Sequence, residues 1–225
     1  MTKKIQVAID GPASSGKSTV AKLLAKRFNY VYCDTGAMYR SVTLAALRRS
    51  IDLSDKESVI EVARKITISF QPGDPDQRVF IDGDEVTRPI RGAEVSANVS
   101  TVAAIPEVRS EMTKEQRHIA SQGGIVMDGR DIGTTVLPNA QVKIFLVATA
   151  HERALRRYRE NVQKGIKTAP LEQIEKAIRL RDQKDSTRAV SPLRQAPDAI
   201  KIDTTSLSID EVTDKISGII KKALA

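Results

Sequence analysis

The most informative stretch of the sequence is IDGPASSGKSTVAKLLA, which joins a β-branched run to an apolar, helix-like run. Gly11 is followed by four residues and then by Gly16, Lys17 and Ser18, the spacing of a phosphate-binding loop between a strand and a helix. Its glycines allow backbone conformations in which amide groups approach phosphate oxygens. The loop predicts a nucleoside triphosphate site. The expected contacts are Gly11, Pro12, Ala13, Ser14, Ser15, Gly16, Lys17, Ser18 and Thr19.

The polar residues of this loop have separate expected tasks. Lys17 reaches the β and γ phosphates, the helix that starts near it directs the positive end of its dipole at the same anion, and the Ser18 hydroxyl can ligate Mg²⁺. The pattern leaves the reaction open, because GTPases, motors, helicases and small-molecule kinases share it. The residues that bind the second substrate must decide among these classes.

Two further motifs place arginines after expected strands. DTGAMYR, residues 34–40, follows the second strand, and DGRDIGT, residues 128–134, follows a later one. Loops at the carboxyl ends of parallel strands line the ligand crevice of an open α/β sheet, so Arg40 and Arg130 are expected near the phosphate loop. Either arginine alone could be an ordinary surface residue. Two converging guanidinium groups repel each other unless an anion lies between them, so the pair favours an anionic acceptor.

Arginines recur in two later helical segments. HERALRRYRE sets Arg153 and Arg157 one helical turn apart, where like charges destabilise a free helix. A triphosphate arriving beneath a closing lid would offset that repulsion, whereas the plainer interpretation is a solvated basic face. Farther along, Arg181 and Asp185 are also one turn apart, and Arg188 follows. They form either an ordinary intrahelical ion pair or a unit in which arginines grip phosphate and Asp185 accepts from a ribose hydroxyl.

A general base is not recognisable from the spacing of the residues. His118 and His151 lie in helical segments without a carboxylate or nucleophile in register, which indicates surface or capping roles. A phosphate monoester is already anionic near pH 7, so it needs only charge neutralisation and in-line positioning to accept a phosphoryl group. The sequence therefore suits an acceptor that carries a phosphate.

The elements that must position these residues alternate along the chain. Short β-branched runs alternate with longer helical runs, so we expect an α/β fold with a parallel sheet flanked by helices. The expected strands are residues 5–10, 30–33, 125–128, 142–147 and 199–203. Capping boxes, in which a Ser or Thr and a Glu satisfy free amides at a helix N-terminus, predict three helix starts. They are SDKE (residues 54–57), TAHE (149–152) and SIDE (208–211).

Two segments depart from this alternation. Residues 66–86 alternate polar and apolar side chains, with a hairpin signal at Asp82-Gly83 and a turn in QPGDPD, which predicts a small antiparallel sheet. The arginine-rich stretch is broken where Gly165 can end one helix and Pro170 can open the next. We expect one phosphate-loop domain with two appendages. These are an insert near residues 66–100 and a helical lid near 151–188.

The composition narrows the class of protein. The 225 residues carry 36 Lys and Arg against 28 Asp and Glu, and the net charge of +8 attracts polyanions without choosing among them. Aromatic residues make up only 4%, which argues against stacking on single-stranded bases. No run approaches the roughly 18 apolar residues of a membrane span, and the N-terminus lacks the apolar region of a signal peptide. We expect a cytoplasmic monomer, with no membrane or specific nucleic acid as partner, in which Cys33 is a buried hydrophobe.

Together the motifs resemble those of the bacterial cytidylate kinases over nearly the whole chain. They are IDGPASSGKST, DTGAMYR, DGRDIGT, KIFLVATAHERALRR and DSTRAVSPLRQAPDAIKIDTT. The expected small sheet is also characteristic of that family, where it belongs to the part that binds the nucleoside monophosphate. The resemblance implies phosphorylation of CMP and dCMP by ATP with Mg²⁺.

The resemblance also implies roles for individual positions. Lys17 and four arginines would assist the transfer: Arg130, Arg153, Arg157 and Arg188. Contacts to the CMP phosphate would come from Arg40, Arg130 and Arg188, and the ribose would meet Arg181 and Asp185. Cytosine would be read by Thr35, Ser100, Arg109 and Asp131. An aspartate can accept from the exocyclic amine of cytosine, whereas uracil presents a carbonyl there, so CMP should be preferred to UMP.

Two alternatives remain open from the sequence. Another small-molecule kinase, acting on uridylate or a sugar acid, would share the phosphate loop, although a sugar hydroxyl would call for a nearby base. A protein that clamps RNA would also exploit the charge of +8, but it would show a continuous basic stripe with aromatic residues. The arginines here gather instead in motifs after strand ends and in one helical segment.

Overall fold

The structure, a computed structural model, describes residues 4–71, 73, 77–163, 165–166 and 168–225. The chain divides into two compact units. Unit 1 comprises Met1–Tyr32 and Ala120–Ala225, and unit 2 comprises Cys33–Ile119. The two ends of the chain therefore build one unit together, and the middle of the chain builds the other.

The main sheet has five strands in the order β2-β6-β1-β7-β8. The strands are β1 (Gln6–Asp10), β2 (Val31–Asp34), β6 (Ile125–Gly129), β7 (Val142–Val147) and β8 (Ile200–Asp203). β1 pairs in parallel with β6 and with β7, and β7 pairs in parallel with β8. The parallel sheet and each of its strands confirm the prediction to within one residue at either end. The three central strands, β1, β6 and β7, are buried on both faces, as a parallel sheet requires, whereas the edge strands β2 and β8 are more exposed.

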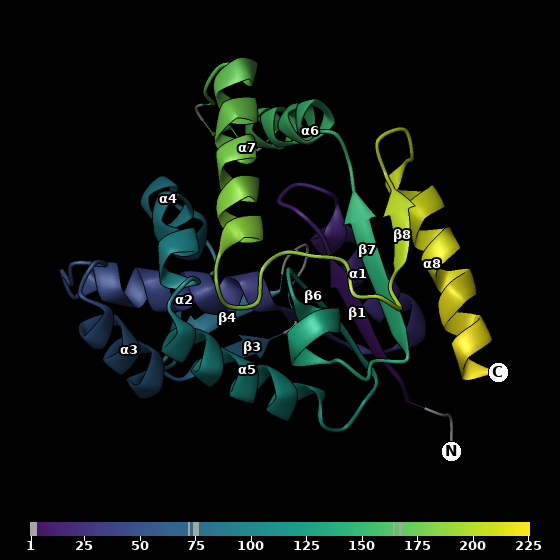
Figure 1. Ribbon diagram of the computed structural model, residues 1–225, viewed down its shortest axis with the longest axis horizontal. Helices are drawn as coiled ribbons and strands as arrows, with labels where there is room; N and C mark the ends of the chain where they lie inside the picture. The colour runs from purple at the N-terminus through teal and green to yellow at the C-terminus, as the bar shows by residue number, and fades with distance from the viewer. Residues whose placement is uncertain (1–3, 72, 74–76, 164, 167) are drawn as a thin grey trace. The chain divides into compact units, whose positions relative to one another are not determined.

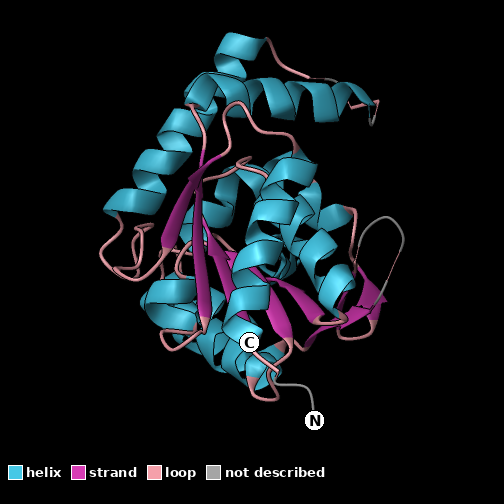
Figure 2. Cartoon of the chain, turned by 90° about the vertical axis from the view of Figure 1, so that its right-hand side faces the viewer, coloured by secondary structure: helices cyan, strands magenta, loops and turns pink. Residues whose placement is uncertain are grey.

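The helices of unit 1 lie beside this sheet and beyond one end of it (Figure 2). They are α1 (Lys17–Phe28), α6 (Ala150–Gln163), α7 (Leu171–Thr187) and α8 (Ile209–Leu224), with a π-helical segment η2 (Ile132–Val136) after β6. α1 packs on α8, and both bury aliphatic side chains in the same core as β1, β6, β7 and β8. In the described part of the chain, none of the helices combines the length and hydropathy needed to cross a bilayer.

The arginine-rich segment folds as a helical hairpin. α6 packs along α7, and Figure 1 shows the pair just beyond the end of β7. Gly165 has a φ of 64° and its amide donates to the Val162 carbonyl, so it ends α6 as predicted. Pro170 is the N-cap of α7. A small apolar cluster, comprising Ala150, Ala154 and Ile178, holds the two helices together.

Unit 2 combines helices with a three-stranded antiparallel sheet. Its helices are α2 (Thr35–Arg48), α3 (Lys56–Lys65), the 3₁₀ turn η1 (Pro89–Arg91), α4 (Ala93–Val102) and α5 (Pro106–Ala120). Its strands are β3 (Ile68–Gln71), β4 (Arg78–Ile81) and β5 (Asp84–Glu85). Asp82 and Gly83 have φ angles of 52° and 91°, which confirms the hairpin between β4 and β5. Most of the expected QPGDPD turn lies outside the described residues.

The three expected capping boxes have different outcomes. The box at SIDE is complete, because Ser208 and Glu211 each accept from the other's amide. At TAHE only half forms, since Thr149 accepts from the Glu152 amide while the Glu152 carboxylate pairs with Arg156. The box at SDKE was wrong by one residue. There Asp55 is the N-cap and its carboxylate accepts from the Ser58 amide at 3.2 Å.

Candidate active site

The phosphate loop joins β1 to α1 and has the backbone that its glycines predict. Gly16 is the N-cap of α1 with a φ of 91°. Gly11 has a φ of 149°, and a Cβ atom added there would lie 2.1 Å from the Leu146 carbonyl oxygen of β7. Only glycine allows this approach of the loop to the neighbouring strand. The first turn of α1 contains no acidic residue, so its free amides and dipole favour an anion.

Lys17 is buried beneath this loop. Only 4% of the residue is exposed, and its Nζ donates to the Pro12 carbonyl at 2.6 Å and lies 3.5 Å from Ser15 Oγ. Burial, with help from the Arg130 charge, lowers the pKa of Lys17 to about 7, while Asp128 and Asp10 oppose the shift. A bound phosphate would supply the negative charge that favours the protonated amine.

Ser18, the next residue of α1, meets the end of β6. Its hydroxyl donates to Asp128 Oδ2 at 2.9 Å, and the Tyr32 hydroxyl donates to Asp128 Oδ1 at 2.8 Å. Asp128 is 3% exposed and is the last residue but one of β6, which is buried along its whole length. A hydroxyl and a carboxylate thus face the phosphate loop together, and such hard oxygen donors suit Mg²⁺.

The two arginines of α6 reach the phosphate loop. Arg157 donates to Ser14 Oγ through Nε at 3.3 Å and Nη2 at 3.1 Å. Arg153 is 4% exposed and donates to the Ala13 carbonyl at 3.1 Å, while its Nη2 pairs with Asp182 of α7 at 2.6 Å. The helix face is therefore directed at the loop. This geometry disfavours the plainer interpretation of a solvated basic face.

Arg130 and α7 form a charged cluster on the same unit. The Arg130 Nε donates to Asp185 Oδ2 at 3.0 Å, and the Arg181 Nε lies 4.0 Å from that oxygen. Burial opposes ionisation of Asp185, but the charges of Arg130 and Arg181 outweigh it and lower the pKa of the carboxyl group. The charges of Arg130 and Arg181 also lower the pKa of Lys17, so the excess positive charge extends to the phosphate loop.

Asp131 and Arg188 form a second buried pair in unit 1. The Arg188 Nη2 lies 3.6 Å from Asp131 Oδ1, and the two side chains are only 7% and 5% exposed. The Arg188 Nε donates to the Ser191 carbonyl at 2.6 Å, which fixes the guanidinium at the end of α7. The predicted residues of unit 1 thus come together from the phosphate loop, the end of β6, α6 and α7.

The other predicted acceptor residues lie in unit 2. Thr35 begins α2 and is 3% exposed, and Arg40 of the same helix donates to Ser96 Oγ of α4 at 2.9 Å. Ser100 lies on α4. Arg109 of α5 is buried, donates to the Ala103 carbonyl at 3.2 Å and stacks over the Tyr39 ring.

Sequence reasoning gave no separate role to two carboxylates of this site. Asp128 was part of the DGRDIGT motif, but its bond with Ser18 joins residues 110 positions apart. Asp10 ends β1 and accepts from backbone amides in η2, more than a hundred residues away. An aspartate at the end of each buried strand beside the phosphate loop was the available signal.

Comparisons with known proteins agree with this geometry. The family model described as cytidylate kinase matches residues 7–222. A cytidylate kinase of Limosilactobacillus reuteri is 69% identical over 99% of this chain and 97% of its own length. A cytidylate kinase of Lactiplantibacillus plantarum is 62% identical over 97% of this chain and 95% of its own.

Similarity to solved structures shows the general fold of the chain. A shikimate kinase from Bacteroides thetaiotaomicron superposes with a TM-score of 0.51 at 11% identity, covering 97% of this chain and 99% of that one. At that identity the likeness shows the fold alone, which is that of a phosphate-loop kinase. The two cytidylate kinases are far more informative about the family, because they match nearly the whole chain at 69% and 62% identity. The chain belongs to the cytidylate kinase family.

Proposed function

We propose that this member of the family transfers the γ-phosphoryl group of ATP to the phosphate of CMP or dCMP in a single in-line step. The observation that carries the proposal is the gathering of Lys17, Arg130, Arg157 and Arg181 around one end of the unit 1 sheet. Phosphoryl transfer spreads negative charge over the transferred group, and fixed cations stabilise that charge. The acceptor oxygen is already anionic, so no general base is required.

The donor site is formed by residues 11–19. The amides of the loop and of the first turn of α1 cradle the phosphates, and Lys17 neutralises the β and γ phosphates. We assign Arg153 and Arg157 to the transferring group. Their contacts with Ala13 and Ser14 support the assignment, because these contacts already hold both guanidinium groups against the loop.

The oxygen donors at the loop fit a magnesium ion. Ser18 and Asp128 supply a hydroxyl and a carboxylate side by side, the kind of partial protein set that Mg²⁺ accepts when phosphates and water complete its shell. When bound there, the ion would neutralise charge on the donor phosphates. Tyr32 supports the site, since its hydroxyl bond holds the other oxygen of Asp128.

We assign the acceptor to the remaining predicted residues. Arg40, Arg130 and Arg188 would bind the CMP phosphate, and Arg181 with Asp185 would bind the ribose. Asp131 would accept from the cytosine amine, and Thr35, Ser100 and Arg109 would complete the reading of the base. Uracil would set a carbonyl against the Asp131 carboxylate, and an unpaired buried acceptor is strongly disfavoured.

The same proposal includes a cytoplasmic, monomeric enzyme. Cys33 supports it in part, because this single cysteine is fully buried and has no second cysteine with which to form an intramolecular disulfide, as is common where thiols stay reduced. Size-exclusion chromatography with light scattering would test the monomer, and a mass near twice 24.6 kDa would contradict it.

A coupled ADP-release assay with Mg²⁺, ATP and each nucleoside monophosphate tests the function. We expect a strong signal with CMP and dCMP, a weak one with UMP and almost none with AMP or GMP. Arg130→Ala should lower kcat/KM for CMP by about 100-fold or more, because it removes a charge-assisted contact to the reacting groups. Arg179→Ala is the matched control, since Arg179 lies on the exposed side of α7 and pairs only with Glu175 in the described contacts.

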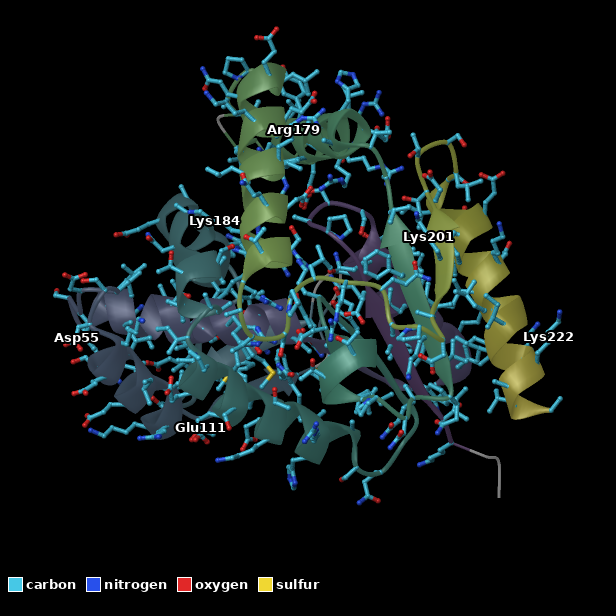
Figure 3. All side chains as sticks on the ribbon, in the orientation of Figure 1. Asp55, Glu111, Arg179, Lys184, Lys201 and Lys222 are labelled. Carbon is cyan, nitrogen blue, oxygen red and sulfur yellow. The ribbon has the colours of Figure 1, made fainter. Side chains whose placement is uncertain are left out.

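The alternative function, RNA binding, predicts a different distribution of positive charge on the surface. Lys184, Lys201 and Lys222 are exposed and lie on α7, β8 and α8, three separate elements of unit 1 (Figure 3). Scattered charges of this kind do not make the continuous stripe that RNA binding requires. Tight retention of RNA on filters at moderate salt, without turnover of CMP, would overturn the kinase proposal.

A further inference from the structure

Asp10 is a buried carboxylate that the mechanism above does not use. It is the last residue of β1 and is 4% exposed. Its Oδ1 accepts from the Ile132 amide at 2.8 Å, and its Oδ2 accepts from the Gly133 amide at 2.7 Å. Both oxygens are thus committed to the backbone of η2, within unit 1.

These two amides lie immediately after the acceptor pair Arg130 and Asp131. On the other side of that pair, Gly129 is held in the sheet, where it lies opposite Asp10 in the parallel register of β1 and β6. The backbone of the pair is therefore fixed at both ends. The sheet holds it before Arg130, and the Asp10 carboxylate holds it after Asp131.

Gly133 lies within this clamp, which is the pair of bonds from the η2 amides to the Asp10 carboxylate. A Cβ atom added to Gly133 would lie 3.4 Å from Asp10 Oδ2, which is ordinary van der Waals contact, and 3.2 Å from Lys143 Cδ, which is tighter than ordinary side-chain packing. An alanine here therefore requires the Lys143 side chain or the η2 backbone to shift by a few tenths of an ångström.

We propose that Asp10 is a positioning residue for the acceptor nucleotide: its carboxylate fixes the η2 amides so that Arg130 and Asp131 keep the orientation that binds CMP. The inference rests on the acceptor roles proposed above for that pair. Asp10 acts through the backbone and does not touch the nucleotide. In Asp10→Asn the carboxamide keeps one acceptor but turns an N–H group toward the second amide, so the clamp loses one bond and gains a repulsion.

Steady-state kinetics at pH 8 with CMP, UMP and ATP as varied substrates test the proposal. In Asp10→Asn we expect KM for CMP to rise by about 10- to 100-fold, the scale of an ångström-size misplacement, with a smaller preference for CMP over UMP. KM for ATP should rise less than KM for CMP, because the donor loop keeps its hydrogen bonds and loses only the support that the Asp10 charge gives to protonated Lys17. Gly133→Ala keeps the charge of Asp10 and crowds Lys143 and the η2 backbone, so it should raise KM for CMP less than Asp10→Asn does. Asp214→Asn, an exposed carboxylate paired with Arg27, is the matched control and should change neither constant.

A measurement on the unaltered protein keeps the test independent of how the variants fold. Hydrogen exchange followed by NMR should show slow exchange of the Ile132 and Gly133 amides, as buried hydrogen-bonded donors require. Exchange of both amides at unprotected rates would overturn the proposal. A folded Asp10→Asn variant with wild-type KM for CMP would also overturn it, as would an equal rise in KM for ATP.

Arg130→Ala and Asp131→Ala test the proposed acceptor contacts separately from the positioning role of Asp10. If Arg130→Ala and Asp131→Ala impair CMP kinetics while Asp10→Asn does not, the positioning role alone fails. If Arg130→Ala and Asp131→Ala leave CMP kinetics unchanged, the proposed acceptor contacts fail and this inference fails with them.

Discussion

Asp10 lies where water cannot reach its carboxylate, and this makes the stability of the fold depend on pH. Burial raises the pKa of Asp10 to about 7 from its ordinary value of 3.8, although its two amide bonds act in the opposite direction. Between these values the folded state binds the proton more tightly than the unfolded state does. The contribution of Asp10 to stability is therefore greatest below about pH 4 and is lost as the pH rises through about 7.

Denaturant unfolding of the wild type and of Asp10→Asn from pH 4 to pH 8 measures this effect. The wild-type free energy of unfolding should fall relative to the variant by roughly 1.4 kcal/mol per pH unit within the window, and the difference should level off above it. The comparison isolates Asp10, because carboxylates with a lowered pKa, such as Asp185, change both proteins equally and with the opposite sign. A difference that does not vary with pH would contradict the prediction.

Substitutions of Asp128 and Tyr32 should raise the Mg²⁺ requirement of the enzyme to different extents. Asp128→Asn removes the only carboxylate charge proposed as a magnesium ligand, so half-maximal activation should require about 10-fold more Mg²⁺ or higher still. Tyr32→Phe leaves the carboxylate and removes only its hydroxyl donor, and it should shift the Mg²⁺ requirement less. A magnesium titration of CMP phosphorylation, run beside Arg179→Ala, measures both shifts. Equal requirements in all proteins would refute the assignment of Asp128.

The conformation of the phosphate loop could be predicted because it follows from local spacing. Around Gly11, Gly16 and Lys17, a strand, a turn and a helix are all encoded within one short segment. The contacts of Asp128 and Asp10 could not be predicted in this way. Their partners lie more than a hundred residues away, and only the pairing of β1 with β6 brings them together.

At the scale of elements, the start of α3 shows which of two adjacent residues caps the helix. The sequence pattern favours Ser54 as the cap, whereas the structure gives that role to Asp55. Both oxygens of Asp55 are engaged by Ser58, through its amide and its hydroxyl. The SDKE pattern was misleading because Ser and Asp are both strong N-cap residues and stand side by side, so spacing alone could not choose between them.

Replacing each of these residues by alanine tests the choice. Asp55→Ala should lower the melting temperature by about 2–4 °C, because free amides of the first turn lose their acceptor. Ser54→Ala should change it by less than 1 °C or so, as expected of an exposed residue outside the cap. Calorimetry of the two variants beside the wild type gives the result. A larger effect in Ser54→Ala would restore the capping box.

The strands were more predictable than the helix starts. The three central strands of the main sheet, β1, β6 and β7, are apolar runs buried on both faces, as at Val142–Val147, and such a run has few alternative interpretations. The start of a helix depends on the conformation of one capping side chain, and neighbouring side chains can compete for its hydrogen-bond partners. The TAHE segment illustrates this, because Arg156 competes for the Glu152 carboxylate and leaves the box half formed.

At the scale of the whole molecule, the core of unit 1 depends on its last helix. Ile216 of α8 is fully buried in the cluster that also contains side chains of β1, α1 and β7. Ile216→Ala should lower the free energy of unfolding by about 2–5 kcal/mol, because it leaves a cavity in that cluster. Leu180→Ala is the control, since Leu180 is 54% exposed on α7 and should change stability by less than about 0.5 kcal/mol. Urea unfolding of both variants measures the two effects.

The order in which the chain is made has a consequence for unit 1, whose two segments are separated in the sequence by unit 2. The ribosome releases the phosphate loop well before β7, the strand that Gly11 approaches, and before β8 and α8. More than a hundred residues lie between the loop and β7, so at about 5–20 residues per second the nascent loop waits several seconds or more for its neighbouring strand. We therefore expect the growing polypeptide to bind nucleotide only after β7 has emerged.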